Sequence, residues 1–175
     1  MITVRRAHEH TAMPWANGRG VSYEVARDND ESGEWRWRLA IAPIVEDGPF
    51  SVLTGVHREL TLLEGEGLVL TIDGNMVMCR RGEVVDFSGD AHTHAALTNG
   101  PVVDLNVMSR AGSERTMQIV DAPASIEDID CLVALDDVVV EFDGRAEMLA
   151  VRDALVGDGL VQLRSGTVAV VRPRR

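Results

Sequence analysis

Apolar and polar residues alternate with a period of two along most of this chain. Because successive side chains of a strand point to opposite faces, this alternation predicts strands. The clearest segments are residues 22–26, 35–41, 68–72, 76–80, 102–108, 138–142 and 147–151. The best helical signal is a short turn over residues 124–129, for which Ser125 is a suitable N-cap. We therefore expect an all-β barrel or sandwich with few short helices.

A weak internal repeat predicts two related halves. At an offset of 70, a hairpin pattern with an Asp-Gly turn is repeated. The offset places Leu68, Leu70, Ile72, Asp73, Gly74 and Met78 over Val138, Val140, Phe142, Asp143, Gly144 and Met148. We interpret residues 1–112 as a larger N-terminal half and residues 113–175 as a smaller C-terminal half, fused as one compact unit.

The composition of the chain limits the kinds of partner that we expect it to bind. The formal net charge of −11 argues against a nucleic-acid partner, because phosphate binding needs clustered positive charge. No apolar run approaches the roughly 20 residues of a membrane span, and the N-terminus lacks the apolar centre of a signal peptide. We expect a cytoplasmic protein without nucleic-acid or membrane partners, present as a monomer or homodimer. The two cysteines, Cys79 and Cys131, lie in strand-like patterns and are expected to be buried free thiols.

Two segments place polar residues among apolar ones. In residues 35–41, Trp35, Trp37, Leu39 and Ile41 are expected on one face and Arg36, Arg38 and Ala40 on the other. Asp104 and Asn106 share a face of another segment. A charged side chain inside a barrel must be paired or bind a polar ligand, and for Arg38, Arg58 and Asp104 both alternatives stay open. The aromatic candidates Trp15 and Trp37 are interpreted as core or pocket wall.

Several motifs resemble one family. They are Pro14–Gly20, Trp35–Ala42, Glu46–Ser51, Leu60–Gly67 and Asp104–Met108. Together they are similar to the HutD/Ves family of bacterial proteins, over roughly Met13 to Met108. The resemblance implies an all-β double cupin, a bicupin-like jelly roll, and an association with histidine utilisation. The resemblance also adds Asn17 to the polar residues that are candidates for contact with a ligand. The chain departs from the family pattern at Ala16, Arg19 and Ala40, where lysine, glycine and serine are usual.

The metal ligands of other cupins are largely absent from this sequence. Aligned on Leu63-Glu64-Gly65, the first two histidine positions fall near Ser51 and Leu53, and the glutamate position falls near Arg58. Only His92 stands near the position of the last ligand. We therefore expect no metal and no cofactor. If a metal does bind, the remaining candidates for its ligands are His57, His92 and His94.

These observations favour a metal-independent bicupin that binds a small carboxylate from histidine breakdown, such as urocanate or a formylated glutamate derivative, and senses or modulates that pathway. The alternatives are a metal-independent isomerase or hydrolase with Asp104 or His92 as general base, and a protein-interaction scaffold. We lean against an enzyme, and no catalytic set is assigned. The candidate ligand-binding residues are Asn17, Arg38, Arg58, Asp104, Asn106, Trp15 and Trp37.

Overall fold

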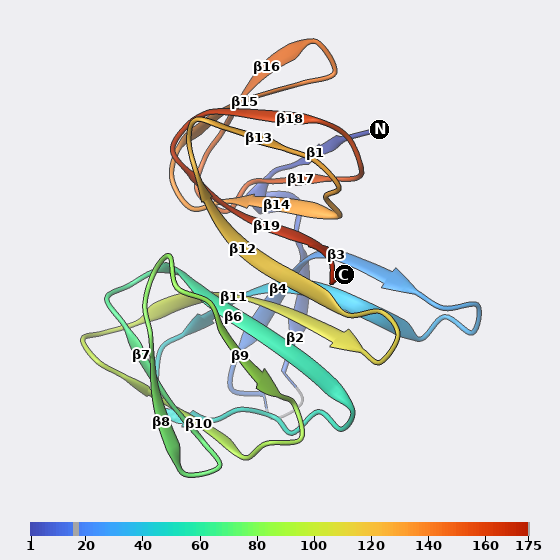
Figure 1. The fold of residues 1–175 in the computed structure, drawn as a ribbon. Coiled ribbons are helices and arrows are strands. Elements are labelled where there is room, and N and C mark those ends of the chain that lie inside the picture. Colours follow the sequence, from blue (N-terminus) through green and yellow to red (C-terminus); the bar gives the residue numbers. More distant parts are fainter. Residues whose placement is uncertain (16–17, 175) are drawn as a thin grey trace. The chain divides into compact units, whose positions relative to one another are not determined.

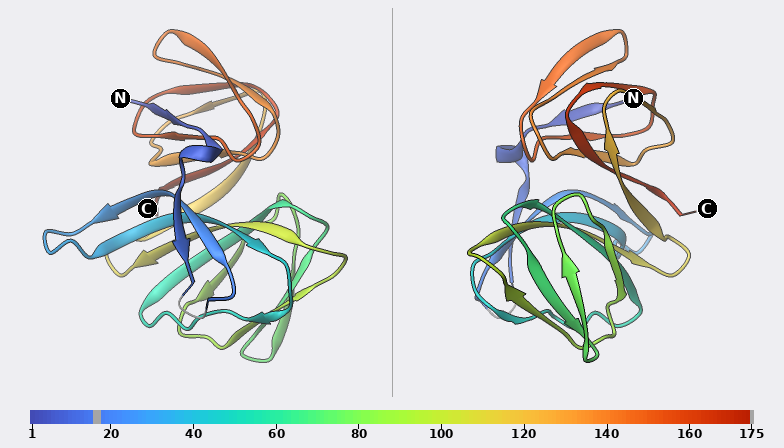
Figure 2. Two further views of the ribbon diagram at one scale, coloured as in Figure 1. Left: turned by 180° about the vertical axis from the view of Figure 1, so that it is seen from behind. Right: turned by 60° about the vertical axis from the view of Figure 1, so that its left-hand side comes forward.

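The computed structural model describes residues 1–15 and 18–174, which form two compact units. We call Ala12–Glu114 the N-barrel, and Met1–Thr11 with Arg115–Arg175 the C-barrel. Each unit contains two β-sheets, and Figures 1 and 2 show how the strands of each unit curve around its interior. Within the described part of the chain, the one helix is the short 3₁₀ helix η1 (Ala7–Glu9). The expected all-β architecture is confirmed.

The N-barrel is built from a six-stranded and a four-stranded sheet. The first has the order β2 (Thr11–Pro14), β3 (Val21–Asn29), β4 (Trp35–Ile44), β11 (Val102–Arg110), β6 (Val56–Glu64) and β9 (Val85–Ser88). The second has the order β5 (Gly48–Pro49), β10 (Thr93–Leu97), β7 (Leu68–Ile72) and β8 (Asn75–Cys79). Buried side chains of both sheets, including Leu62 and Leu70, form one apolar cluster between them.

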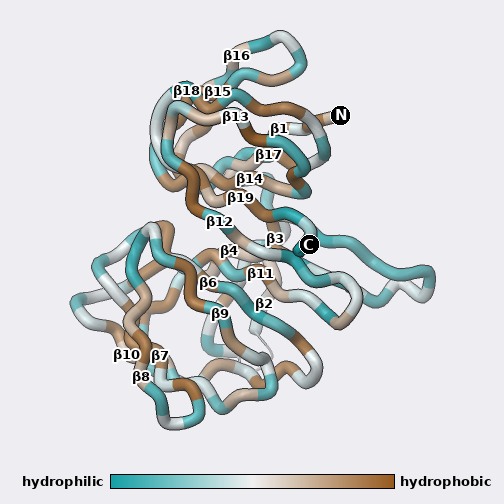
Figure 3. Tube along the Cα trace, viewed as in Figure 1, coloured by the Kyte–Doolittle hydropathy of each residue, from teal (hydrophilic) through white to brown (hydrophobic). Residues whose placement is uncertain are grey.

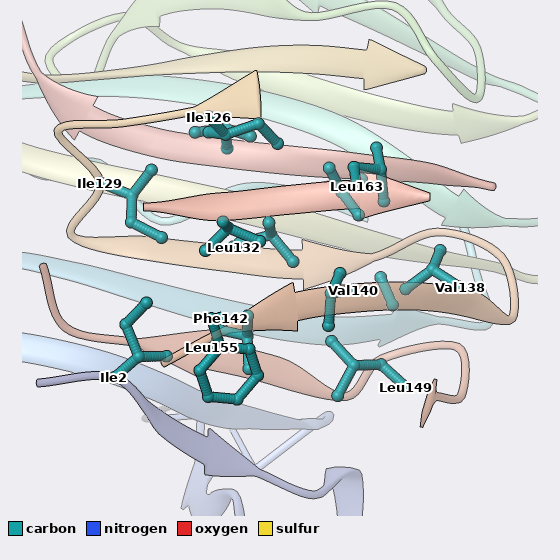
Figure 4. Close-up of a cluster of buried hydrophobic side chains, with 14 residues drawn as sticks. Ile2, Ile126, Ile129, Leu132, Val138, Val140, Phe142, Leu149, Leu155 and Leu163 are labelled. Atoms are coloured by element: carbon teal, nitrogen blue, oxygen red, sulfur yellow. The ribbon is translucent and has the colours of Figure 1, made fainter. Parts of the chain in front are cut away.

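The C-barrel repeats this plan with a five-stranded and a four-stranded sheet. The first has the order β1 (Thr3–Arg5), β17 (Ala154–Val156), β14 (Cys131–Ala134), β19 (Thr167–Pro173) and β12 (Arg115–Asp121). The second has the order β13 (Ala124–Ile126), β18 (Val161–Ser165), β15 (Val138–Phe142) and β16 (Arg145–Leu149). Apolar side chains such as Leu132, Val140 and Leu163 from both sheets fill its interior (Figure 4).

The internal repeat seen in the sequence corresponds to two equivalent hairpins. β7 pairs with β8 in the N-barrel, and β15 pairs with β16 in the C-barrel. Both turns have two residues with positive φ, Asp73 (46°) with Gly74 (86°) and Asp143 (49°) with Gly144 (73°). Such turns match the right-handed twist of paired strands, and Asp-Gly is a favoured sequence for them. The predicted hairpins are therefore confirmed.

Two local expectations differ from the structure. Residues 124–126 form β13 rather than a helical turn, because Ala124–Ile126 pairs with Val161–Leu163 of β18. The first eleven residues belong to the C-barrel instead of the N-terminal half, because β1 pairs with β17. Arg6 reinforces this pairing through an ion pair of 2.9 Å with Asp153. Both differences arise from pairing with distant strands, which a local pattern does not reveal.

Hydropathy follows the strand pattern. Hydrophilic residues gather at the β3–β4 and β15–β16 hairpins (Figure 3). Cys79 and Cys131 are buried and free, as expected. None of the helices among the described residues is long and apolar enough to cross a membrane.

Candidate ligand-binding site

A cavity of about 360 Å³ lies within the N-barrel. Small-molecule sites commonly have volumes of roughly 300–1,000 Å³, so this cavity suits a small metabolite. Its walls come from β4, β6 and β11, from the chain around Met13–Trp15, and from the segment after β5. The polar and aromatic lining residues are Trp15, Ser22, Arg38, Phe50, Ser51, Arg58, Asp104 and Asn106.

The register of three neighbouring strands explains why these side chains meet. Residues directly opposite one another on paired antiparallel strands share a face of the sheet. Across β4, β11 and β6 this gives the rows Arg38–Met108–Arg58, Ala40–Asn106–Leu60 and Ala42–Asp104–Leu62. Ala40 and Ala42 are small, which leaves space above Asn106 and Asp104. Arg38 and Arg58 stand two strands apart, so their backbones are separated by roughly 10 Å.

Arg58 is the most deeply placed cation of the cavity. Only 7% of its surface is exposed, and its Cζ lies 4.9 Å from the ring centroid of Phe50 and 5.0 Å from that of Phe87. Burial lowers the pKa of Arg58 to about 10, although the neighbouring Asp104 carboxylate opposes this shift. The guanidinium is therefore charged at neutral pH, and the two rings stabilise the charge. Its Nε has no hydrogen-bond partner among the residues described.

Asp104 and Asn106 supply buried polar atoms beside this cation. Their exposed fractions are 3% and 5%. Burial raises the pKa of Asp104 to about 7, while Arg58 and the backbone of Ala42 act in the opposite direction. Within the described ranges, Oδ1 of Asp104 and Oδ1 of Asn106 have no hydrogen-bond partner. Because a buried polar atom without a partner is costly, this arrangement favours occupation of the cavity by a polar ligand or by water.

Arg38 lines the cavity on β4, and its Cζ lies 4.9 Å from the ring centroid of Trp35. Burial lowers the pKa of Arg38, and the carboxylate of Glu24 counteracts this effect. The expected positions of Arg38 and Ala40 on one face are confirmed. Trp35 does not follow the expected alternation, because the pairing of β3 and β4 contains a bulge between Asp28 and Asn29. A bulge lets two residues of one strand face one of its partner, which brings Trp35 to the side of Arg38.

Trp37 is the one described candidate that the structure does not bring to the cavity. Its side chain is buried with that of Leu39 on the opposite face of β4. The alternation of a strand separates it from Arg38. The interpretation of Trp37 as a residue that contacts a ligand is therefore not supported. Asn17 lies outside the described residues.

Trp15 is held at the cavity by its own loop. Its Nε1 donates a hydrogen bond of 2.7 Å to Oγ of Ser22, and its backbone N–H donates to the carbonyl of Gly20 at 2.9 Å. Gly18 accommodates the turn with a φ of 69°. Arg19 forms an ion pair of 2.8 Å with Glu46. Trp15 therefore forms part of the cavity wall.

The fit of Trp15 against Gly20 gives a test of this wall. A Cβ atom at position 20 would lie 2.7 Å from the indole, so Gly20→Ala is expected to displace the ring and to weaken ligand binding about threefold to tenfold. Gly48→Ala is the matched control, because nothing lies within 4 Å of its added Cβ. Titration calorimetry on both variants measures the difference. Equal affinities would show that the position of Trp15 is irrelevant to binding.

The three remaining candidates for metal ligands, His57, His92 and His94, do not lie together in one site. Among the described residues, no group of three or more histidine, cysteine, aspartate or glutamate side chains is placed to hold an ion. His92 and His94 line a separate surface groove, while His57 on β6 lies 3.5 Å from Glu59. Ser51, Leu53 and Arg58, which occupy the expected metal-ligand positions, do line the cavity. A guanidinium at the expected carboxylate position repels a cation.

Two aromatic residues that surround Arg58 were not among the site residues predicted from the sequence. Phe50, in the segment after β5, and Phe87, on β9, enclose the Arg58 guanidinium. Phe50 lies inside a motif already noted, so its position carried a signal. Phe87 follows an ordinary strand alternation and carried none.

The two sheets of each unit define a bicupin, and its first barrel contains a cavity lined by Arg38, Arg58 and Asp104. The chain belongs to the HutD family, whose model matches residues 7–170. This family is associated with histidine utilisation.

Relatives agree with this assignment. An "Uncharacterized 21.2 kDa protein in hutC 3'region" of Pseudomonas putida is 36% identical over 109 residues, which cover 61% of this chain and 57% of that protein. "Protein Ves" of Citrobacter koseri is 35% identical over 98 residues, which cover 55% and 51%. The chain thus matches just over half the length of these curated relatives.

Solved structures support the fold. HutD from Pseudomonas fluorescens SBW25, described with the words "Formate condition", superimposes with a TM-score of 0.85 and 29% identity over 100% of both chains. Salicylate 1,2-dioxygenase from Pseudoaminobacter salicylatoxidans gives a TM-score of 0.62 with 8% identity, over 98% of this chain and 80% of that chain. The second likeness concerns the fold alone. The expected double cupin is confirmed.

Proposed function

We propose that the N-barrel binds a small carboxylate metabolite of histidine degradation without a metal, and that binding serves to sense or modulate flux through that pathway. The observation that carries the proposal is the buried Arg58 guanidinium beside Asp104 and Asn106, whose Oδ1 atoms have no hydrogen-bond partner in the described part of the chain. A guanidinium binds a carboxylate with short, charge-assisted hydrogen bonds. Asn106 offers an amide for a second polar group of the ligand.

The chemistry of the pocket also suggests the class of ligand. Arg38 and Arg58 supply positive charge, and Ala40 and Ala42 leave room for a short carbon skeleton. Urocanate and formylated glutamate derivatives combine a carboxylate with a second polar group, so both suit these walls. The expected cytoplasmic location, the expected lack of nucleic-acid and membrane partners, and a monomeric or homodimeric state remain part of the proposal.

Binding is tested with metal-stripped protein by thermal-shift titration. The compounds are urocanate, formiminoglutamate, formylglutamate, glutamate, histidine and formate. A ligand of the native state raises the melting temperature in a saturable way. If none of these compounds raises the melting temperature, the proposal is contradicted.

Arg38 provides a matched pair of variants. Arg38→Ala removes a cation from the cavity wall and is expected to weaken binding about tenfold, the effect of one charge-assisted hydrogen bond. Arg36→Ala removes the neighbouring arginine, which is half-exposed and pairs with Asp28 at 2.5 Å. This variant should bind as the wild type does. Equal loss in both variants, measured by calorimetry, would show a nonspecific charge effect.

A catalytic role is the second candidate, and Asp104 is the observation that favours it. A carboxyl group with a pKa of about 7 inside a cavity is suited to accept and return a proton. His92, the other proposed base, lines a different groove. Turnover of urocanate or formylglutamate, followed by NMR, would distinguish an isomerase or hydrolase from a binding protein. A scaffold with a filled N-barrel is disfavoured by the cavity itself.

A further inference from the structure

The hydrogen-bonding capacity of Asp104 sets a condition on any anionic ligand. An ionised carboxylate only accepts hydrogen bonds, and so does the carboxylate of a ligand. Two such groups in one small cavity repel each other and form no hydrogen bond. If Asp104 carries a proton, its carboxyl group donates to the ligand instead, and the repulsion disappears.

The charged and titratable groups around Asp104 are compatible with the uptake of a proton by its carboxylate. From β6, the Arg58 guanidinium faces Asp104 and favours its ionised form, and on β11 itself Asn106 is neutral. From β8, Cys79 interacts with it electrostatically, and burial raises the pKa of that thiol to about 12, so the thiol is neutral. From β4 the adjacent residue is Ala42, and Arg38 lies further along the strand. While Asp104 is ionised, its charge offsets that of Arg58, so a ligand carboxylate beside Arg58 places a second negative charge next to the same guanidinium.

We propose that the cavity binds its carboxylate ligand together with one proton, held on Asp104, so that Arg58 neutralises the ligand and Asp104 donates a hydrogen bond to it. This inference rests on the proposed function. The proton comes from solvent and returns to solvent when the ligand leaves. Burial already brings the pKa of Asp104 to about 7, so proton uptake near neutrality requires little free energy.

The affinity must then depend on pH with a definite sign. Below the pKa of Asp104 the free protein already carries the proton, so the affinity is constant. Above it, each binding event takes up a proton, so the affinity falls by up to tenfold per pH unit. Between pH 6 and pH 8 we expect about a tenfold loss. Arg58 and Cys79 titrate above this range, and no histidine lines the cavity among the described residues.

Titration calorimetry with formylglutamate tests this directly, because that probe has no group that titrates between pH 6 and pH 8. Measurement at each pH in two cationic buffers of different ionisation enthalpy that buffer at that pH separates proton uptake from binding. For the wild type we expect about one proton taken up per ligand at pH 8 and close to none at pH 6. Asp104→Asn keeps a neutral donor and should bind equally at both pH values without proton uptake. Asp86→Asn, an exposed carboxylate on β9, should behave as the wild type does.

The outcomes separate the two proposals. Binding with no proton uptake at pH 8 overturns the coupling but leaves the binding function. No binding at pH 6 of formylglutamate or of any other compound of the thermal-shift series overturns both. If Asp104→Asn does not fold, the buffer comparison on the wild type still decides. A pH dependence that persists in a folded Asp104→Asn variant assigns the proton to another group and contradicts the inference.

Discussion

Replacing Arg58 by leucine is expected to weaken binding of a carboxylate ligand about 30-fold or more, since loss of a buried charge partner costs roughly 2–5 kcal/mol. Arg58 lies deeper in the cavity than any other cation described, between Phe50 and Phe87. The change leaves Asp104 buried without its cationic neighbour, so we expect the variant to fold with Asp104 protonated and to lose stability as the pH rises. Leucine offers its methyl groups to the two rings that now hold the guanidinium. Calorimetry gives the affinity and thermal unfolding gives the stability.

Arg58→Lys is the informative companion. Lysine keeps the positive charge, but it loses the planar fork that binds a carboxylate with two hydrogen bonds and stacks on aromatic rings. Its affinity should therefore fall between those of the wild type and Arg58→Leu. The exposed Arg36→Leu controls for the loss of a positive charge elsewhere on the same sheet. An Arg58→Leu protein that is folded and binds as tightly as the wild type would remove the basis of the proposed function.

Much of the fold was predictable because its determinants are local in sequence. The alternation over residues 68–72 and 138–142, with Asp-Gly after each, identifies strands and the turn that follows them. Strand alternation and hairpin turns depend on neighbouring residues. The same local logic placed Arg38 and Ala40 on the face that lines the cavity.

The failures have a common physical origin in long-range pairing. The pattern of residues 124–126 predicts the polar start of a helix. These residues instead form a strand, because they pair with β18. The first residues of the chain carry no signal that β17, some 150 positions away, is their partner, as the pairing of Thr3 with Val156 shows. The bulge between β3 and β4 shifts Trp35 out of its expected alternation. A bulge is set by the partner strand, so one strand alone does not reveal it.

The candidate site was predictable in its chemistry but not in its assembly. Asp104 and Asn106 could be paired from one strand, whereas their meeting with Arg58 depends on the register of β11 with β6. The burial that raises the pKa of Asp104 is likewise a property of the folded barrel. The repeat is also asymmetric in a way that the sequence did not reveal. Among the described residues, the buried ionisable side chains of the C-barrel other than cysteine are His10 and Asp153, whereas those of the N-barrel are Glu24, Arg58, Glu59 and Asp104.

The charge of Asp104 should also be visible in the stability of the protein without ligand. Its pKa is about 7 in the folded protein, against roughly 3.9 in an unfolded chain. Between these values the unfolded chain releases the proton while the folded protein keeps it. The folded state is therefore at its full relative stability below about pH 4, loses about 1.4 kcal/mol per pH unit as the pH rises, and loses no more above about pH 7.

Asp104→Asn removes this titration, so the variant should be more stable than the wild type by an amount that grows with pH. The difference in the free energy of unfolding is expected to be within about 1 kcal/mol at pH 4 and about 4 kcal/mol at pH 8. Urea unfolding of both proteins at each pH measures it. The difference between the two free energies of unfolding removes the contribution of the other carboxylates, which titrate equally in the two proteins. Because Asn and protonated Asp have nearly the same shape, a constant difference across this range would mean that Asp104 is ionised in the folded protein throughout, and that its buried charge is satisfied by a partner other than a proton.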